Sequence, residues 1–184
     1  MNPISDNTDR RSFLKTGSLV TAASLLPGLA RAQGEASEIK VALIGCGGRG
    51  TGAAAQSLNV PGTRLVAIAD AFEDNANKAA ATLKKQFPDR VDLPAERIFH
   101  GFDAYKKAID SADLVLLCTP PGFRPMHFEY AVEKGKHAFV EKPVAVDGPG
   151  ISKFIAAAKT ADTKNLKVVC GLQRHYQNSY LETL

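Results

Sequence analysis

The chain has 184 residues, of which 45% are hydrophobic and 23% are charged, and its formal net charge is +4. These values are typical of a globular protein with one domain and a short extension, and they exclude repeat and low-complexity architectures. The basic excess is small and no basic stripe carries interleaved aromatic residues, so no nucleic-acid partner is expected.

Cysteines and histidines predict neither a disulfide framework nor a metal site. The three cysteines, at positions 46, 118 and 170, form no C-x-x-C pair, and each lies near the end of an apolar run. We therefore expect them to be small buried hydrophobic residues. The four histidines are too scattered to form a metal site, and the chain has no G-x-S-x-G motif for a serine nucleophile.

Residues 1–32 are predicted to be an export signal. The segment "DRRSFLK" (9–15) precedes the apolar stretch "TGSLVTAASLLPGLA", and Ala30-Arg31-Ala32 has the small-x-small pattern of a cleavage site. The segment resembles a twin-arginine signal with Arg10 and Arg11 as the pair, although Asp9 stands where Ser or Thr is usual. This resemblance implies the export machinery as a partner and a periplasmic or secreted location. An amphipathic helix or a membrane anchor is the alternative, but the apolar stretch is short for a bilayer span. Residues 33–37 are interpreted as a short linker.

A nucleotide-binding turn is predicted immediately after the first strand. Residues 39–44 are almost all apolar, as in a parallel strand that is covered on both faces. Gly45-Cys46-Gly47-Gly48-Arg49-Gly50 then fits G-x-G-x-x-G, and an alanine-rich helix follows. Gly45 permits the tight turn, Gly47 lets a pyrophosphate approach the backbone, and Gly50 allows helix and strand to pack closely.

Asp70 is the expected ligand of the adenosine ribose. It ends the second predicted strand, "RLVAIAD", and lies twenty positions after Gly50. A 2′-phosphate beside this carboxylate would cost about 4 kcal/mol for each like-charge pair at ~4 Å and an effective dielectric of ~20. The next residues, Ala71 and Phe72, offer no compensating arginine. The sequence therefore predicts NAD in preference to NADP.

The rest of the chain continues the alternation of strands and helices. Helices are expected over residues 74–87, 103–110, 125–135 and 150–161, and strands over residues 97–100, 112–120, 137–140 and 166–171. Six strands in this order predict an α/β fold, a doubly wound Rossmann sheet of order 3-2-1-4-5-6 with helices on both faces. We assign this domain to residues 38–172.

The segment "HAFVEKP" (137–143) places an acid and a base at a strand end. Pro143 cannot donate to a sheet ladder, so strand pairing should stop before it. Glu141 and Lys142 then lie at the carboxyl end of a parallel strand, where open α/β sheets bind ligands. A solvated strand end that carries ordinary surface charges is the alternative.

Four segments of the sequence resemble one protein family. "VALIGCGGRG", "VAIAD", "LCTP" and above all "GKHAFVEKPVAV" resemble the Gfo/Idh/MocA oxidoreductases over residues 38–174. The resemblance implies that Asp70 holds the adenosine ribose, that Glu141 contacts the nicotinamide ribose and that Lys142 is catalytic. The other cofactor-binding candidates are Gly45, Gly47, Gly48, Arg49, Gly50, Thr119 and Pro120. The loop "TPPGFRPMH" (119–127) is longer than the family pattern, so its own contacts are not implied.

The same resemblance implies an activity. Family members transfer a hydride between a nicotinamide and a sugar or polyol hydroxyl, and Lys142 would act on that hydroxyl either as a cation or as a neutral base. The family adds a second, mixed α/β domain; residues 173–184 are interpreted as its truncated start, and the full-length form is expected to be a homo-oligomer. Two alternatives stay open: a redox-neutral NAD-dependent glycosidase and a non-catalytic NAD-binding module.

Overall fold

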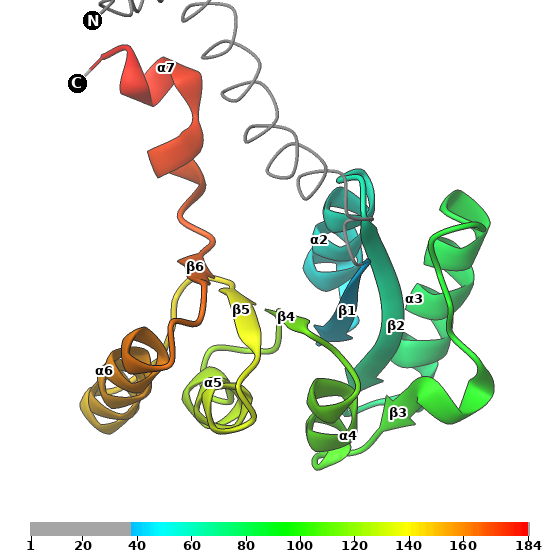
Figure 1. Ribbon diagram of the computed structural model, residues 1–184, viewed down its shortest axis with the longest axis horizontal. Helices are drawn as coiled ribbons and strands as arrows, with labels where there is room; N and C mark the ends of the chain where they lie inside the picture. The colour runs from blue at the N-terminus through cyan, green and yellow to red at the C-terminus, as the bar shows by residue number, and fades with distance from the viewer. Residues whose placement is uncertain (1–37, 184) are drawn as a thin grey trace, which may run out of the picture. The chain divides into compact units, whose positions relative to one another are not determined.

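Six parallel strands form one sheet in the computed structural model, which describes residues 38–183 (Figure 1). The predicted export signal and linker therefore lie outside the described residues. The strands are β1 (Ile39–Ile44), β2 (Thr63–Asp70), β3 (Ile98–His100), β4 (Leu114–Leu117), β5 (His137–Val140) and β6 (Val168–Cys170). Their order is β3-β2-β1-β4-β5-β6. The predicted fold class and strand order are confirmed.

Helices connect each strand to the next. They are α2 (Gly48–Leu58), α3 (Glu73–Gln86), α4 (Ala104–Asp110), α5 (Arg124–Glu133) and α6 (Gly148–Thr163). Every predicted helix is present, with ends shifted by one or two residues. Sequence patterns did not predict two short 3-10 helices, η1 (Ala95–Arg97) and η2 (Gln173–Tyr176), or the last helix, α7 (Asn178–Leu181). These pieces are too short to show a helical period.

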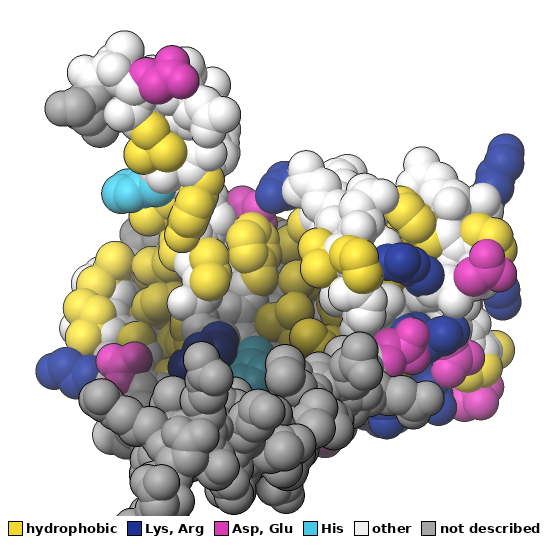
Figure 2. Space-filling model, turned by 45° about the horizontal axis from the view of Figure 1, so that its top comes forward, with side chains coloured by type: hydrophobic (Ala, Val, Ile, Leu, Met, Phe, Trp, Pro, Cys, Tyr) yellow, Lys and Arg dark blue, Asp and Glu magenta, His cyan; other side chains and the backbone are white. Residues whose placement is uncertain are grey.

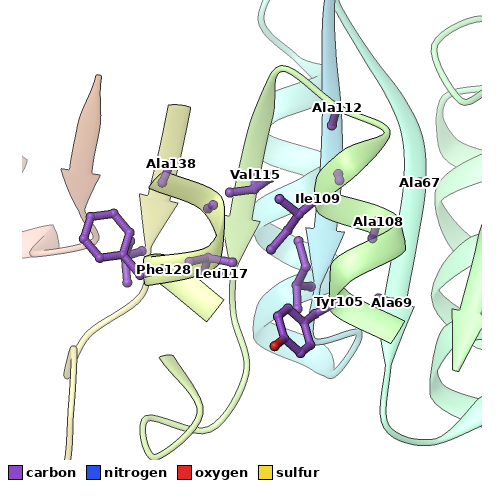
Figure 3. Packing of buried hydrophobic residues seen from close by; sticks show 14 of the residues in the cluster. Ala67, Ala69, Tyr105, Ala108, Ile109, Ala112, Val115, Leu117, Phe128 and Ala138 are labelled. Atoms are coloured by element: carbon purple, nitrogen blue, oxygen red, sulfur yellow. The ribbon is translucent and has the colours of Figure 1, made fainter. Parts of the chain in front are cut away.

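Both faces of the sheet are packed, which explains the nearly continuous apolar strands. One cluster of buried residues joins β1, β2, β4 and β5 to α4, α5 and α6. Figure 3 shows part of it: Ile109 of α4 lies beside Val115 of β4, and Ala108 lies toward Ala67 of β2. A second cluster joins β1 and β2 to α2 and α3, largely through small alanines. Small side chains bring the helix backbones close to the sheet, and hence close to the strand ends.

The β6 end of the molecule exposes large hydrophobic residues. Figure 2 shows hydrophobic side chains gathered on the face that carries α6 and β6. The large exposed hydrophobic residues from α6 onward are Ile151, Ile155, Val169, Leu172, Tyr176, Tyr180 and Leu181. Among residues 38–183, no helix is long and apolar enough to cross a bilayer.

Candidate functional site

The glycine-rich turn after β1 has no room for side chains at two positions and open space at a third. Gly45 has φ +94°, and a Cβ atom there would lie 2.6 Å from the backbone nitrogen of Thr119. A Cβ atom on Gly50 would lie 1.8 Å from the carbonyl oxygen of Gly45. At Gly47 a Cβ atom would meet nothing within 4 Å. The turn is therefore tightly packed at Gly45 and Gly50 but open at Gly47, where a ligand could approach the backbone.

Helix α2 presents its amino end at this open side. Gly47 is the N-cap residue, no side chain caps the helix, and its first turn contains no acidic residue. The first backbone bond of the helix runs from the Thr51 N–H to the Gly47 carbonyl, at 2.9 Å. The preceding N–H groups, including those of Gly48 and Arg49, have no helical acceptor and are available to an anion. The turn thus fits the pyrophosphate of a dinucleotide.

Asp70 is held against the glycine-rich turn. Its Oδ2 accepts the Cys46 N–H at 2.7 Å, and its Oδ1 accepts the Phe72 N–H at 3.0 Å and the Asn75 amide at 3.3 Å. The acid and the turn therefore form one hydrogen-bonded unit, although they lie on different strands. Because a carboxylate has about four lone-pair sites, Asp70 can accept further bonds from ribose hydroxyls.

A cavity of about 590 Å³ opens in front of Asp70. The expected site residues Gly45, Gly47, Asp70, Thr119 and Pro120 all line it. The lining also includes residues that the sequence did not single out, namely Phe72, Asn75, Phe102, Tyr105, Phe123, Arg124 and His127. A cavity of this size and mainly apolar lining is in the range of small-molecule and cofactor sites.

His127 forms part of the cavity wall and is 5% exposed. Its ring stacks on Tyr105 with 4.2 Å between the ring centroids, and its Nδ1 lies 3.2 Å from the Thr119 hydroxyl. Burial lowers the pKa of His127 to about 4. The ring is therefore neutral at physiological pH and contributes a hydrogen bond, not a charge. The sequence marks His127 only as the end of the loop 119–127 and does not mark Tyr105, because their proximity is set by the packing of α4 beside α5.

Glu141 lies on the other side of the glycine-rich turn and is 5% exposed. Arg49 reaches it from α2: Nε donates to Oε1 at 2.6 Å and Nη2 lies 2.5 Å from the same oxygen. A Cβ atom on Gly171 would lie 3.2 Å from Oε1, so the chain after β6 closes around the carboxylate. Two residues predicted to bind the cofactor, Arg49 and Glu141, are thus joined as an ion pair.

Lys142 is exposed at the end of β5 and does not line the cavity. The next residue, Pro143, follows a cis peptide bond, and its carbonyl accepts a hydrogen bond from Nη1 of Arg124. Arg124 is the first residue of α5 and comes from the long loop after β4. The structure therefore separates the predicted site into a cavity beside Asp70 and a charged group of residues at the end of β5.

The three cysteines are free thiols close to these strand ends. Cys46 is buried as expected, whereas Cys118 and Cys170 are only partly buried. Burial raises the pKa of all three and brings that of Cys118 to about 12, so the thiols are neutral. Among residues 38–183, no group of three His, Cys, Asp or Glu side chains could hold a metal ion.

Comparison with known proteins identifies relatives over most of the described chain. A Gfo/Idh/MocA family model, described as "Oxidoreductase family, NAD-binding Rossmann fold", matches residues 39–170. A glycosyl hydrolase family 109 protein from Solibacter usitatus is 32% identical over 154 residues, which is 76% of this chain and 34% of that protein. Another from Streptomyces coelicolor is 38% identical over 112 residues, 59% of this chain and 23% of that protein. The chain thus spans about a third or less of the length of these relatives.

Solved structures share the fold. The apo scyllo-inositol dehydrogenase from Lactobacillus casei matches with a TM-score of 0.61 and 22% identity over 80% of this chain and 40% of that protein. A 3-ketoreductase from Actinomadura kijaniata in complex with NADP matches with a TM-score of 0.60 and 22% identity over 80% of this chain and 42% of that protein. Similarity at this level of identity establishes the common architecture alone.

Proposed function

Because the chain belongs to the Gfo/Idh/MocA oxidoreductase family and has its NAD-binding Rossmann fold, we propose that it is the cofactor-binding part of an enzyme that oxidises a sugar or polyol. The observation that carries the proposal is the hydrogen-bonded unit of Asp70 and the glycine-rich turn. In this unit a carboxylate, which would accept hydrogen bonds from ribose hydroxyls, lies next to the uncapped start of α2, whose N–H groups would bind phosphates. The part of the cavity next to Asp70, lined by Ala71, Phe72 and Phe102, is apolar and suits an adenosine group.

NAD is the proposed cofactor rather than NADP. The Asp70 carboxylate would face the 2′ position of the ribose, where a phosphate carries about −1.5 to −2 charges. Within residues 38–183, the hydrogen-bond donors to Asp70 are backbone and amide N–H groups and not cationic side chains. The position therefore favours hydroxyl groups, which can donate to the carboxylate, over a second anion.

Each residue at the end of β5 has a separate role in the proposal. Glu141, held by Arg49, would accept hydrogen bonds from the nicotinamide ribose. Lys142, exposed at the strand end, would contact the substrate hydroxyl and either stabilise the oxygen as a cation while the proton leaves or receive that proton as a neutral base. The nicotinamide, when bound, supplies the acceptor for the hydride that leaves the same carbon. One hydride and one proton thus leave the substrate, which becomes a ketone or an aldehyde.

Cofactor binding and substrate oxidation can be tested separately. Calorimetric titration of the chain with NAD and NADP should give tighter binding of NAD. In the complete protein, a sugar or polyol should then produce NADH, followed by its absorbance. A chain that binds neither dinucleotide would contradict the proposed cofactor site. Binding without NADH formation from any sugar or polyol would leave a non-catalytic NAD-binding module.

A second candidate is a redox-neutral glycosidase that uses NAD within one catalytic cycle. Its support is a shared name: the relatives from Solibacter usitatus and Streptomyces coelicolor, which are 32% and 38% identical to this chain, are both named glycosyl hydrolase family 109 proteins. The two candidates differ in their products. Release of an alcohol from a chromogenic glycoside without net NADH formation would favour the glycosidase, whereas NADH formation from a free sugar favours the oxidoreductase.

We also propose that the protein is exported through residues 1–32 and assembles as a homo-oligomer. Changing Arg10 and Arg11 to Lys should retain the protein in the cytoplasm, which cell fractionation would detect; an unchanged distribution would contradict the export proposal. The exposed hydrophobic residues near α6 and β6 are the surface that we expect assembly to cover. Light scattering of the complete protein measures its oligomeric state.

A further inference from the structure

Arg124 is a buried cation that forms no ion pair with any residue of the part of the chain that the structure describes. The residue is 6% exposed, and its only hydrogen bond to the described residues runs from Nη1 to the Pro143 carbonyl. Its Nε atom is buried and has no hydrogen-bond partner among them. Of the five N–H donors of the guanidinium, the one on Nε is therefore buried without an acceptor in this part of the chain, and one on Nη1 is used by the Pro143 carbonyl.

This state is costly unless a ligand completes it. Most buried polar groups in folded proteins are hydrogen-bonded, and an unpaired buried charge is among the least favourable groups. Burial lowers the pKa of Arg124, but an arginine is not deprotonated in proteins, so the charge persists. Arg124 also lines the cavity in front of Asp70. An acceptor that enters from this cavity could supply the missing partner.

The charges around Arg124 indicate what kind of acceptor this is. Three cations, Arg49, Arg124 and Lys142, lie at the strand ends around a single acid, Glu141. Arg49 already uses that acid at 2.5 and 2.6 Å. Arg124 donates to the Pro143 carbonyl, and the exposed Lys142 immediately precedes Pro143; neither belongs to an ion pair within residues 38–183. Two such cations are complementary to an anion, and Arg in particular binds carboxylate and phosphate in a bidentate manner.

The cofactor is a less suitable source of this anion. Its pyrophosphate is expected at the amino end of α2, where Gly48 and Arg49 offer free N–H groups. Arg124 belongs to α5, beside the residue that follows Lys142. The family resemblance assigns no role to Arg124 either, because it comes from the part of the loop 119–127 that departs from the family pattern.

We propose that Arg124 binds an anionic group on the substrate, so that the preferred substrate is an acidic sugar that carries a carboxylate or a phosphate. The inference rests on the proposed function, since it specifies the substrate class of the same site. Arg124 then acts as a specificity-determining residue: its guanidinium binds the anionic group while Lys142 contacts the hydroxyl that is oxidised.

The test compares matched sugars in the complete protein with saturating NAD. The pairs are glucose with glucuronate and glucose 6-phosphate, and galactose with galacturonate and galactose 6-phosphate, followed by NADH formation. At least one charged member should have a kcat/KM at least tenfold above its neutral partner. Comparison of the sugars that carry a carboxylate with those that carry a phosphate shows which anion Arg124 binds. Arg124→Gln should reduce this ratio at least tenfold, mainly through KM, and Arg124→Lys should keep part of it.

Arg90→Gln is the matched control. Arg90 also donates to backbone carbonyls, those of Leu58 and Val60, both at 2.9 Å, but it lies near the start of β2, away from the ligand-binding edge. The Arg90→Gln variant should leave the ratio of kcat/KM between charged and neutral sugars unchanged. Thermal unfolding of each variant shows whether it is folded; if Arg124→Gln is not, the comparison rests on Arg124→Lys.

Three results would overturn the inference. The first is equal or greater activity on the neutral sugars. The second is an equal loss on neutral and charged sugars in Arg124→Gln, which would indicate that Arg124 only positions the Lys142 segment. The third is a loss of NAD affinity in that variant. If no sugar reduces NAD, the proposed function itself fails, and calorimetric titration of the NAD complex with glucuronate and glucose 6-phosphate decides the inference; binding of neither would overturn it.

Discussion

The two sides of the glycine-rich turn are built in different ways. On the Asp70 side, which comprises Asp70, the turn and the cavity, the acid binds backbone N–H groups that are at most 24 positions away. On the Glu141 side, which comprises Glu141, Lys142 and their arginines, a side chain pairs with another side chain 92 positions away. Two neighbouring βα turns therefore suffice to join Asp70 to the glycine-rich turn, whereas Arg49 and Glu141 meet only when segments 92 positions apart have come together.

Gly50→Ala should give the largest effect, because it disrupts the turn that both sides share. The added Cβ atom would lie 1.8 Å from the Gly45 oxygen, so the helix must move away from the strand. We expect a loss of about 3 kcal/mol or more in the free energy of unfolding. NAD affinity should fall at least tenfold. Denaturant unfolding and calorimetry measure the two quantities.

The matched control for this substitution is Gly52→Ala in the same helix. A Cβ atom there would meet nothing within 4 Å, and alanine favours helices by up to about 1 kcal/mol over glycine. Equal losses in the two variants would show that close packing at Gly50 is not what stabilises the turn.

His127, in the wall of the cavity on the Asp70 side, should make the stability of the protein depend on pH. The unfolded chain protonates His127 near its ordinary pKa, whereas the folded protein does so only near pH 4. Between these values the unfolded state binds more protons, so stability is complete above about pH 6.5 and falls as the pH is lowered to about 4. The loss from this group is about 3 kcal/mol. His127→Phe, which can still stack on Tyr105, should show a shallower acid loss when unfolding is measured from pH 7.5 to 4.

The exposed His100 serves as the control for this pH dependence. His100→Gln should retain the full acid loss of the unmodified protein. An unchanged pH dependence in His127→Phe would mean that the buried ring does not remain neutral in the folded state.

Asp70→Asn tests the carboxylate of the Asp70 side with little change in shape. The amide oxygen can still accept the Cys46 N–H, but the negative charge is lost. NAD should bind about tenfold more weakly, about 1.4 kcal/mol, since hydrogen bonds to a charged group are stronger than to a neutral one. The preference for NAD over NADP should narrow. Asp74→Asn, on the exposed first turn of α3, should change neither affinity.

The smallest effect is expected from Arg49→Gln on the Glu141 side. Glu141 is buried and would lose its cation, but the Arg49 side chain is 53% exposed, so water screens the pair. We expect a loss of about 1 kcal/mol in the free energy of unfolding. The pair Arg64–Glu38, with side chains 36% and 45% exposed, is the internal reference. Arg64→Gln should cost less than Arg49→Gln; the reverse order would contradict the structural role of Arg49.

The same difference explains what could be predicted from the sequence. The sheet order followed from apolar runs and their alternation with helices, and the turn and Asp70 followed from a spacing of twenty residues. These features are local. The Glu141 side is different, because its contacts depend on which distant segments meet after folding. Sequence periodicity therefore does not predict the ion pair between Arg49 and Glu141 or the burial of Arg124. In the sequence His127 is one of four scattered histidines and the end of the long loop 119–127, but its contact with Tyr105 is not predicted, because that contact arises from two helices that pack side by side.

The pairing of β1 with β4 has a consequence for how the chain folds. Val41 of β1 lies opposite Leu114 of β4, so the central pair of the sheet joins residues 73 positions apart. Loop-closure entropy must be lost before such contacts contribute, and chains dominated by them fold slowly. The turn after β1 can close against Thr119 only when this pairing is complete. Dinucleotide binding should therefore appear in the last kinetic phase of refolding, later than the recovery of helical circular dichroism.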